Sequence, residues 1–449
     1  MDTENNSNFT PQTSDFKKGF YLGEDGERVP EGWTPRPLSE LTTKIGSGAT
    51  PRGGKDAYKE QGISLIRSQN ILDLKFEPSG LAFIDDEQAG QLANVEIEAE
   101  DVLINITGDS VARVCRVPSS FLPARVNQHV AIVRADQYEA SPRFLEYMLV
   151  TRANKGDLLG LASAGATRNA LTKGMLEGFT RTFPPLPEQK AIAAVLGSLD
   201  DKIELLREQN ETLEALAQTL FKRWFIDFNF PDENGNPYKD SGGKMIPSEL
   251  GEIPEGWQIG KLKDFGKIVC GKTPSKAIKS NYGDEVLFIK IPDMHGNVFI
   301  LRSGEYLSSE GAESQSNKTI PKGSIMVSCI ATVGLVALTS SAAQTNQQIN
   351  SIVPNQKNET EYLFLRLKTL NGFLQNLGAG GSATLNINTT SFSEVELIRP
   401  DDQRLIDFHQ LASPLFSKVE SNAKQIQTLT DLRDTLLPKL MKGEIRVTA

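Results

Sequence analysis

Short runs of β-branched and other apolar residues recur along the chain, each bounded by Gly, Pro or Asn. Runs of about four to eight such residues between turn-forming residues predict β-strands. They form two sets, at 63–66, 102–106, 111–117 and 130–133, and then at 286–291, 324–330, 334–338 and 349–353. A helix is predicted after each set, at 142–159 and at 361–377. The pattern therefore predicts two domains that each mix α-helices with β-strands.

A longer pattern follows each set of strands, in which apolar residues advance by alternating steps of three and four. This is the heptad seam of a coiled-coil helix, and it runs over 196–224 in the first copy and over 412–440 in the second. Cap-like residues lie near its start, at 197–198 and 413–414, so we expect each long helix to begin or bend there. Pro438 should end or kink the second helix.

The two seams can be buried against each other. If the helices run antiparallel and Asn210 lies opposite Asn422, every layer pairs an a-type with a d-type position, as an antiparallel pair requires. A buried Asn pair would fix register and orientation at some cost in stability. The alternative is that each helix packs only on its own domain.

Apolar residues that lie off the seam predict a second contact surface on the helices. They occur at matching places in the two copies and are Leu216, Phe221, Leu432 and Leu437. Two roles are open for them: binding another subunit, and packing against the linker or the end domains.

The two halves are copies of one another. Glu-Gly-Trp at 31–33 returns at 255–257, and the Gly-x-Thr-Pro loop at 48–51 returns at 271–274. The repeat predicts five segments: a first domain at 20–186, a helical region at 187–230, a linker at 231–253, a second domain at 254–399 and a C-terminal helical region at 400–449.

Composition agrees with more than one domain. A chain of 449 residues exceeds what one hydrophobic core usually holds. Its 39% hydrophobic and 23% charged residues are typical of a globular protein, and no run approaches the roughly 20 apolar residues of a membrane span. The N-terminal residues are polar and acidic, unlike a secretory signal, so we expect no membrane association and a cytoplasmic location.

The residues that usually carry catalysis do not group in this sequence. The three cysteines and three histidines show no zinc-ligand spacing, and no nucleophile stands beside a base. Residues 266–273 match the GxxxxGK[ST] pattern of a P-loop, but Pro274 follows at once where a helix should begin. The sequence therefore predicts a binding protein without a cofactor of its own. A P-loop nucleotide-binding protein and a purely structural coiled-coil adaptor are the alternatives.

Charge gives a mixed indication. A net charge of −9 argues against a polyanionic partner, because phosphate contacts need local Lys and Arg. Basic stretches without acidic residues nevertheless lie at matching places, at 42–55 and 265–283, and the stretch 160–174 adds Arg168 and Lys173. Solvated surface loops are the simpler explanation for any one of them. Recurrence in both copies favours contacts with nucleic acid.

Across nearly its whole length the chain resembles the specificity subunit of type I restriction-modification systems. The resemblance rests on the two Glu-Gly-Trp turns, the two Gly-x-Thr-Pro loops and the segments 184–189, 221–225, 237–239, 243–245 and 436–440. The second copy departs from the family's Leu-Pro-x-Glu-Gln pattern at 399–403, where the chain enters its second long helix.

This resemblance implies a fold of the α/β class, with two mixed α/β target-recognition domains joined by two long antiparallel coiled-coil helices in pseudo-two-fold symmetry. It implies that each domain reads one half of a bipartite, asymmetric site in double-stranded DNA. The helices would set the spacer and dock two methyltransferase subunits, which further restriction and translocase subunits join. S-adenosylmethionine, magnesium and ATP would belong to those partners, and this chain would be non-catalytic.

Within this resemblance, the basic loops supply the expected DNA contacts. These are Arg52, Lys55 and Arg168 in the first domain and Lys272, Lys276 and Thr384 in the second. Candidates for base edges are Arg67, Gln69 and Asn70, and opposite them Lys290, because Arg and Lys suit guanine while Gln and Asn suit adenine.

Overall fold

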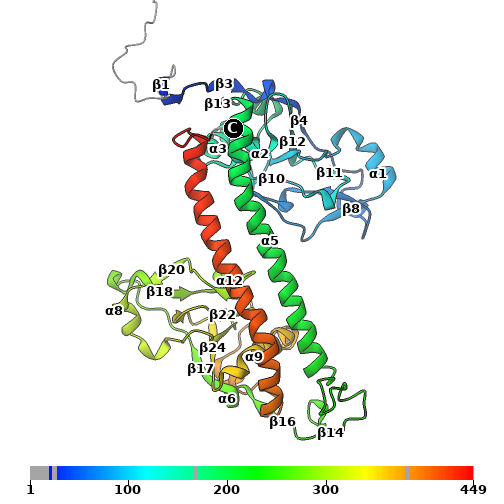
Figure 1. Cartoon of the computed structure of the whole chain (residues 1–449), viewed down its shortest axis with the longest axis vertical. Coiled ribbons are helices and arrows are strands. Elements are labelled where there is room, and N and C mark those ends of the chain that lie inside the picture. Colours follow the sequence, from blue (N-terminus) through cyan, green and yellow to red (C-terminus); the bar gives the residue numbers. More distant parts are fainter. Residues whose placement is uncertain (1–19, 23–27, 165–168, 380–383, 448–449) are drawn as a thin grey trace, which may run out of the picture. The chain divides into compact units, whose positions relative to one another are not determined.

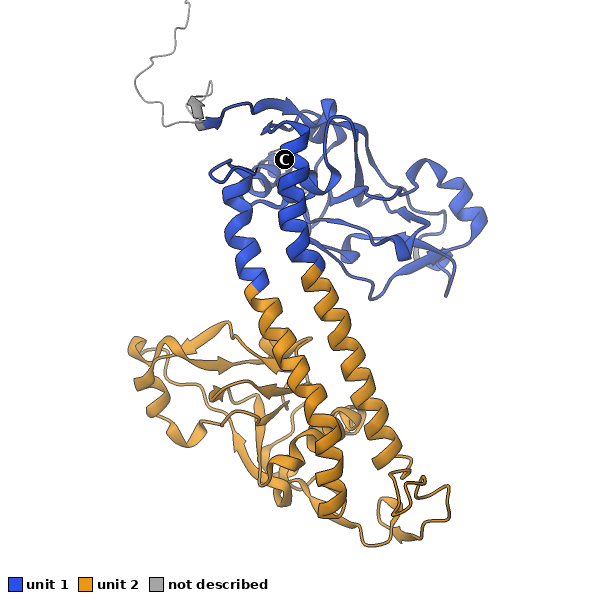
Figure 2. Cartoon of the chain, viewed as in Figure 1, with its two compact units in different colours: residues 1–201, 429–449 blue, residues 202–428 orange. Residues whose placement is uncertain are grey.

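The computed structural model describes residues 20–22, 28–164, 169–379 and 384–447. The chain forms two compact units, residues 1–201 with 429–449 and residues 202–428 (Figure 2). Each unit combines a mixed domain with part of each of two long helices, α5 (Leu186–Phe225) and α12 (Asp402–Met441) (Figure 1). Every helix among the described residues is too short or too polar to cross a lipid bilayer.

The domain of unit 1 is built on two sheets. An antiparallel sheet has the strand order β10-β9-β12-β4, and a second sheet has the order β11-β5-β8. The strands are β4 (Thr42–Ser47), β5 (Ile63–Ile66), β8 (Ala82–Ile84), β9 (Val102–Asn105), β10 (Val114–Arg116), β11 (Ala124–Val126) and β12 (Val130–Ala135). The domain also contains three strand pairs: β1 (Phe20–Leu22) with β2 (Arg28–Pro30), β3 (Thr34–Pro37) with β13 (Thr180–Phe183), and β6 (Ile71–Leu72) with β7 (Lys75–Phe76).

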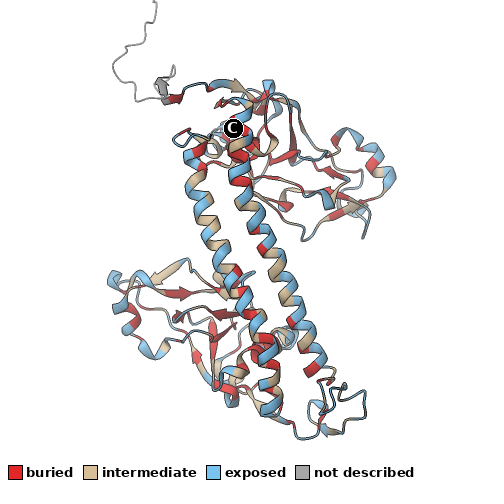
Figure 3. Ribbon diagram, in the orientation of Figure 1, coloured by how far each residue is buried: buried red, intermediate tan, exposed pale blue. Residues whose placement is uncertain are grey.

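The central strands of this domain are buried on both faces, as Figure 3 shows by their colour. Successive residues of β9 enter different cores: Val102 and Ile104 join one apolar cluster, and Leu103 joins another. Because neighbouring side chains of a strand alternate between faces, a strand between two cores has to be apolar throughout. This explains why the sequence shows continuous apolar runs here rather than alternation.

Unit 2 repeats this plan. Its larger sheet has the order β17-β24-β21-β22-β19 and its smaller sheet the order β20-β18-β23, so that β17, β24, β21 and β22 correspond to β4, β12, β9 and β10. The strands are β17 (Gly266–Cys270), β18 (Tyr282–Ile289), β19 (Phe299–Ile300), β20 (Glu305–Leu307), β21 (Ile325–Ser328), β22 (Val336–Thr339), β23 (Ala343–Thr345) and β24 (Ile349–Pro354). Two further pairs are β14 (Met245–Ser248) with β15 (Gly251–Pro254) and β16 (Gln258–Lys261) with β25 (Glu396–Arg399). The prediction of two mixed α/β domains is confirmed.

The helix predicted after each set of strands is in fact two helices. In unit 1 these are α2 (Pro142–Val150) and α3 (Arg152–Ser163), and in unit 2 they are α9 (Thr360–Thr369) and α10 (Asn371–Gly378). Thr151 separates the first pair: its backbone is outside the helical region and its hydroxyl accepts a hydrogen bond from the amide of Asn154. A residue of this kind ends one helix and caps the next, so the prediction of one continuous helix was wrong.

Neither long helix begins at its predicted cap, and Pro438 does not end the second one. α5 already begins at Leu186, α12 begins at Asp402, and α12 continues past Pro438 to Met441. The additional turns carry buried apolar residues, among them Ile192 in α5 and Phe408 in α12, that join the core of the neighbouring domain. Burial of these side chains outweighs the weak helix propensity of Gly and Pro nearby.

The long helices pair antiparallel within each unit. In unit 2, Asn210 of α5 bonds to Asn422 of α12, and the rings of Trp224 and Phe408 lie with their centroids 5.7 Å apart. In unit 1, Asp200 of α5 pairs with Arg433 of α12 at 2.7 Å. Both helices also pack on their domains, so the alternative in which they pack only there is wrong.

The Glu-Gly-Trp turn fastens each domain to the start of its long helix. Trp33 Nε1 donates to Glu188 Oε2 over 3.1 Å, and Trp257 Nε1 donates to Asp401 Oδ2 over 3.1 Å. Asp401 lies in the segment where the second copy departs from the family pattern. The aspartate supplies an equivalent acceptor, so the departure does not remove the contact.

Candidate nucleic-acid interface

The Gly-x-Thr-Pro loops follow β4 and β17 and are held in the same way in both units. The amide of Gly48 donates to Val130 O at 2.8 Å, and that of Gly271 donates to Ile349 O at 3.1 Å. A Cβ atom on either glycine would lie 2.1 Å from a backbone oxygen, of Val126 and Asn346 respectively. Only glycine allows this close approach, so the fold requires a glycine at this position in both loops.

This arrangement also settles the P-loop match at 266–273. Gly266–Cys270 is strand β17, paired with β24, and the residues after it form the glycine loop with no α-helix directly following. A P-loop requires a loop in place of this strand and a helix after it. Within the described ranges, no group of three His, Cys, Asp or Glu residues is placed to hold a metal ion.

Arg67 and Lys290 occupy equivalent turns at the ends of β5 and β18. The amide of Arg67 donates to Asn70 Oδ1 at 3.1 Å, and the amide of Lys290 donates to Asp293 Oδ2 at 2.8 Å. In both units the side chain of the residue three positions later in the sequence therefore accepts a hydrogen bond from the basic residue's amide and fixes its backbone. The structure thus brings the predicted base-reading residues of the two copies to the same place in the fold.

The guanidinium of Arg67 lies over the ring of Tyr58, 5.5 Å from its centroid, and donates to the carbonyl oxygen of Gly80. Gln69 Nε2 donates to the same oxygen at 3.2 Å. Arg67 is half-buried, and its Nε finds no hydrogen-bond partner in the part of the chain that the structure describes. Two of the three predicted base-reading side chains of this domain therefore gather at one carbonyl oxygen.

Asn70 is placed differently from its predicted role. It is fully buried, and its Nδ2 donates to Glu77 O at 2.9 Å and to Ser79 O at 3.3 Å. With both functions of its amide used inside the loop, this side chain holds the turn under Arg67 and is not available to a base edge. The prediction for Asn70 is corrected accordingly.

In unit 2 the corresponding surroundings are charged. Lys290 Nζ lies 2.5 Å from Glu305 Oε1, and Lys276 Nζ lies 3.6 Å from the same oxygen. Tyr282, between them in sequence, donates from its hydroxyl to Pro274 O at 2.9 Å and so ties the glycine loop to β18. Burial and the carboxylate of Glu305 raise the pKa of Tyr282.

Sequence reasoning missed Tyr58, Tyr282 and Glu305. The two tyrosines are separated by the same number of residues as Gly32 and Gly256, so the repeat itself contained this signal. Glu305 carried no such signal, because it reaches the lysines through the pairing of β18 with β20.

Four of the remaining predicted contacts lie in loops. Arg52, Lys272, Lys276 and Thr384 are exposed, and the carbonyl of Lys272 accepts a hydrogen bond from Gln315 Nε2 at 2.8 Å. Arg168 and the side chain of Lys55 lie outside the described residues.

The four off-seam residues of the helices divide into two pairs. Leu216 of α5 and Leu432 of α12 are 46% and 45% exposed, as a partner surface requires. Phe221 is buried against Phe225 and Tyr362, and Leu437 is buried in the core of unit 1. The two buried residues therefore pack against the end domains, Phe221 against the second and Leu437 against the first, which is the second of the roles left open by the sequence.

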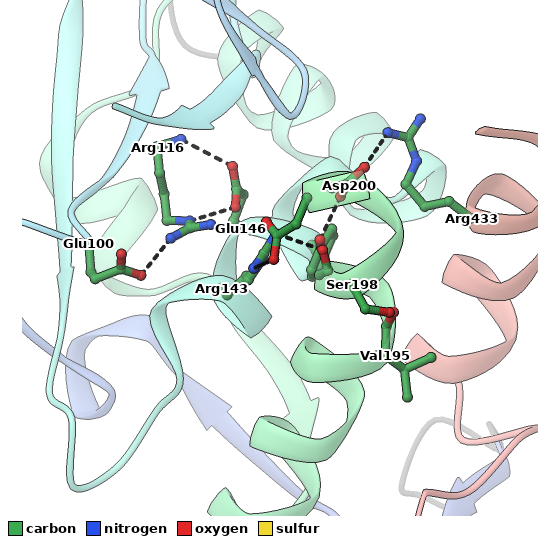
Figure 4. Close-up of polar contacts among 11 residues, drawn as sticks. Glu100, Arg116, Arg143, Glu146, Val195, Ser198, Asp200 and Arg433 are labelled. Carbon is green, nitrogen blue, oxygen red and sulfur yellow. Dashed lines mark hydrogen bonds and ion pairs between the residues drawn. The ribbon is translucent and has the colours of Figure 1, made fainter. Parts of the chain in front are cut away.

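Polar contacts hold α2 on the long helices of unit 1 (Figure 4). Asp200 accepts a hydrogen bond from Tyr147 at 2.5 Å and one from Arg433 of α12 at 2.7 Å. Arg143 binds the next carboxylate, Asp201, at 3.0 and 2.5 Å. Burial and the carboxylate of Asp200 raise the pKa of Tyr147. The network positions the domain on its helices.

Comparison with known proteins agrees with this arrangement. Residues 30–215 and 254–429 each match the domain described as "Type I restriction modification DNA specificity domain". The chain is 35% identical, over 464 aligned residues, to the type I restriction enzyme HindI specificity subunit of Haemophilus influenzae, covering 92% of this chain and 99% of that one. It is 30% identical over 312 residues to the MjaIX specificity subunit of Methanocaldococcus jannaschii, covering 68% and 69%.

A solved structure shares the fold. The S subunit of a type I restriction-modification system from M. genitalium superposes with a TM-score of 0.58 at 15% identity, over 91% of this chain and 96% of that one. Two DNA specificity domains on paired helices define a DNA-recognition protein. The chain belongs to the family of type I restriction-modification specificity subunits. It is a non-catalytic subunit of such a system and recognises DNA sequence.

Proposed function

We propose that the chain reads a bipartite, asymmetric site in double-stranded DNA, one half with each domain. The domains are residues 20–186 and 254–399, connected by the helical regions 187–230 and 400–449 and the linker 231–253. The observation that carries this proposal is the placement of Arg67 and Lys290 at equivalent turns. The turns are alike but the side chains and their surroundings differ, so the two domains would read different bases.

Two kinds of DNA contact follow from the chemistry of these residues. Arg67 and Lys290 can donate to guanine and Gln69 to adenine in the major groove. Basic residues that flank this site in the sequence can bind phosphates and set the position of each domain. We assign this second role to Arg52, Lys55, Arg168, Lys272 and Lys276, with Thr384 as a neutral contact.

The long helices would carry the partners. We propose that two methyltransferase subunits dock on the surfaces around Leu216 and Leu432, which are exposed at matching positions of α5 and α12. The hydrogen bond between Asn210 and the buried Asn422 fixes the register of the helices and with it the spacer between the half-sites. Restriction and translocase subunits would join this assembly on cytoplasmic DNA, and S-adenosylmethionine, magnesium and ATP would bind to the partner subunits.

The test is to express the chain with the methyltransferase subunit of its own system and to map methylated adenines in the DNA of those cells. We expect methylation at one motif made of two specified parts separated by unspecified bases. The methyltransferase subunit expressed alone is the control and should leave no such motif. Scattered marks, or a single uninterrupted motif, would overturn the proposal.

A further inference from the structure

One carboxylate in unit 2 serves two of the proposed DNA contacts. Glu305 Oε1 lies 2.5 Å from Lys290 Nζ and 3.6 Å from Lys276 Nζ. These lysines come from different segments, the end of β18 and the loop after Pro274, and Glu305 begins β20. The carboxylate therefore stands where the two basic segments meet.

The position of Glu305 is fixed by the sheet. Its residue pairs with Phe288 in the β18–β20 ladder, and its carbonyl accepts a hydrogen bond from Ser303 Oγ at 2.5 Å. Its second carboxylate oxygen, Oε2, is buried without a hydrogen-bond partner among the described residues, so the carboxylate presents Oε1 to the lysines. The two lysines hold the pKa of Glu305 below its ordinary value, which keeps the carboxylate charged.

In unit 1 the basic residue at the corresponding turn is paired with an uncharged group. There the basic residue at the equivalent turn, Arg67, donates to the neutral carbonyl of Gly80. The hydrogen-bond partner of Arg67 is uncharged, whereas the positive charge of Lys290 lies beside the negative charge of Glu305. The two domains therefore differ in the electrostatics of the residue at this turn.

We propose that Glu305 is a specificity-determining residue, which makes Lys290 select the neutral acceptors of a base edge over phosphates and weakens the phosphate contact of Lys276. This inference rests on the proposed function, in which these lysines contact DNA. A lysine ammonium has three N–H donors, and pairing with Glu305 leaves donors free to bind a base. The neighbouring carboxylate cancels most of the long-range attraction for phosphate and repels a phosphate that approaches.

Binding to DNA of any sequence depends mainly on phosphate contacts, whereas binding to the target also uses base contacts. A carboxylate that weakens the phosphate contacts and spares the base contacts lowers the affinity for random DNA more than the affinity for the target. Glu305 therefore raises the ratio of the affinity for the target to the affinity for random DNA.

The experiment compares Glu305→Gln with the unchanged chain, each as the full chain assembled with its methyltransferase subunits. Binding is measured to a duplex with the methylation motif and to a duplex of the same composition in scrambled order, over a range of salt. Glu394→Gln is the matched control, because Glu394 also pairs with two lysines of unit 2, Lys261 and Lys263, away from the candidate loops. Both variants remove one negative charge.

We expect Glu305→Gln to raise the affinity for the scrambled duplex by about tenfold at 0.1 M salt, and to steepen its salt dependence by about one phosphate contact. Affinity for the motif duplex should change much less, so the ratio falls. Glu394→Gln should leave the ratio unchanged. Equal ratios for Glu305→Gln and Glu394→Gln would overturn the inference, whether or not the motif is bound.

Further variants separate this inference from the proposed function. In Glu305→Gln combined with Lys276→Ala and Lys290→Ala, the gain on the scrambled duplex should disappear, because it acts through these lysines. If the two lysine substitutions alone leave binding to both duplexes unchanged, these residues do not contact DNA and the proposed function fails at this loop. If they weaken binding but Glu305→Gln has no effect, only the role of Glu305 fails.

Discussion

Asn422 donates a hydrogen bond from its side-chain amide to the side-chain oxygen of Asn210, 2.9 Å away, between the two long helices in unit 2. Asn422 is fully buried, and its own Oδ1 has no partner among the described residues. A slip by one turn would leave each amide facing apolar side chains. The pair therefore penalises every register except the one observed.

Replacing both asparagines with leucine should raise the free energy of unfolding by about 1–3 kcal/mol, because the buried amide of Asn422 and the half-buried amide of Asn210 give way to apolar packing. Replacing Asn210 alone should lower it by about 1–3 kcal/mol, because the buried Asn422 then loses its hydrogen bond of 2.9 Å and keeps only the longer one, of 3.4 Å, to Gln209 Oε1. Urea denaturation of the two variants measures both effects. A single variant as stable as the unchanged chain would contradict this account of the pair.

Leu216 and Phe221 lie five positions apart on α5 and should respond differently to substitution. Leu216→Asp, with Leu432→Asp in α12, should change the free energy of unfolding by no more than about 0.5 kcal/mol because both sites are exposed. It should weaken binding of the methyltransferase subunit by about tenfold or more if this is the docking surface.

Phe221→Ala should instead destabilise unit 2 by about 3–5 kcal/mol, because it empties a site in the aromatic core. Thermal unfolding and co-purification with the methyltransferase subunit distinguish the two cases. Retained co-purification of the double aspartate variant would place the docking surface elsewhere.

The two halves of the target should be separable by single substitutions. Arg67→Ala should relax the methylated motif at one base pair of one half-site, and Lys290→Ala at one base pair of the other, each losing about 1–3 kcal/mol of discrimination. Mapping of methylated adenines in cells with either variant reads this directly, and each variant is the control for the other. If both variants relax the same half-site, the assignment of one domain to each half is wrong.

The carboxylate of Glu394 provides a test of pH dependence. Hydrogen bonds from Lys261 and Lys263 hold its pKa at about 2, below the ordinary value of 4.5. A folded-state pKa below the unfolded one means that the contribution to stability is fully present above about pH 4.5 and is lost as the pH falls towards 2.

The denaturation midpoints of the unchanged chain and of Glu394→Gln should therefore differ most at neutral pH and converge in acid. Taking the difference between the two proteins removes the contribution of all other titrating groups. A difference that stays constant down to the acid limit of folding would show that the ion pairs contribute nothing.

Local patterns in the sequence predicted much of the fold. Strand β5 matches its predicted run at 63–66, and the antiparallel pairing proposed from the heptads brings Asn210 next to Asn422. These features depend on residues close together in sequence or on a period that either helix shows alone. The division of the first domain's helix at Thr151 also has a local cause, because Thr151 caps α3. A single capping residue is, however, a weak indication of a helix boundary when the apolar residues on both sides keep the helical period.

Long-range contacts account for what the sequence did not predict. The early start of α5 depends on Ile192 reaching a core formed by distant strands, and the burial of Phe221 depends on Tyr362. The same holds in the candidate interface, where Asn70 is used up by backbone carbonyls and Glu305 reaches Lys290 across a β-ladder. The residue types in the sequence indicated which charges and hydrogen-bonding groups the interface contains. The pairing of the strands determines which of these side chains already have partners inside the domain.

In the turns that end β5 and β18, the backbone hydrogen bond that forms the turn does not involve the side chain of the basic residue. In each, the residue three positions ahead holds the backbone, and the side chain of Arg67 or Lys290 takes no part in forming the turn's own hydrogen bond. Two different basic residues already occupy this place in one chain. A single codon change there could therefore give a new side chain without a new loop, and a lineage could acquire a new target in small steps while its scaffold stays the same.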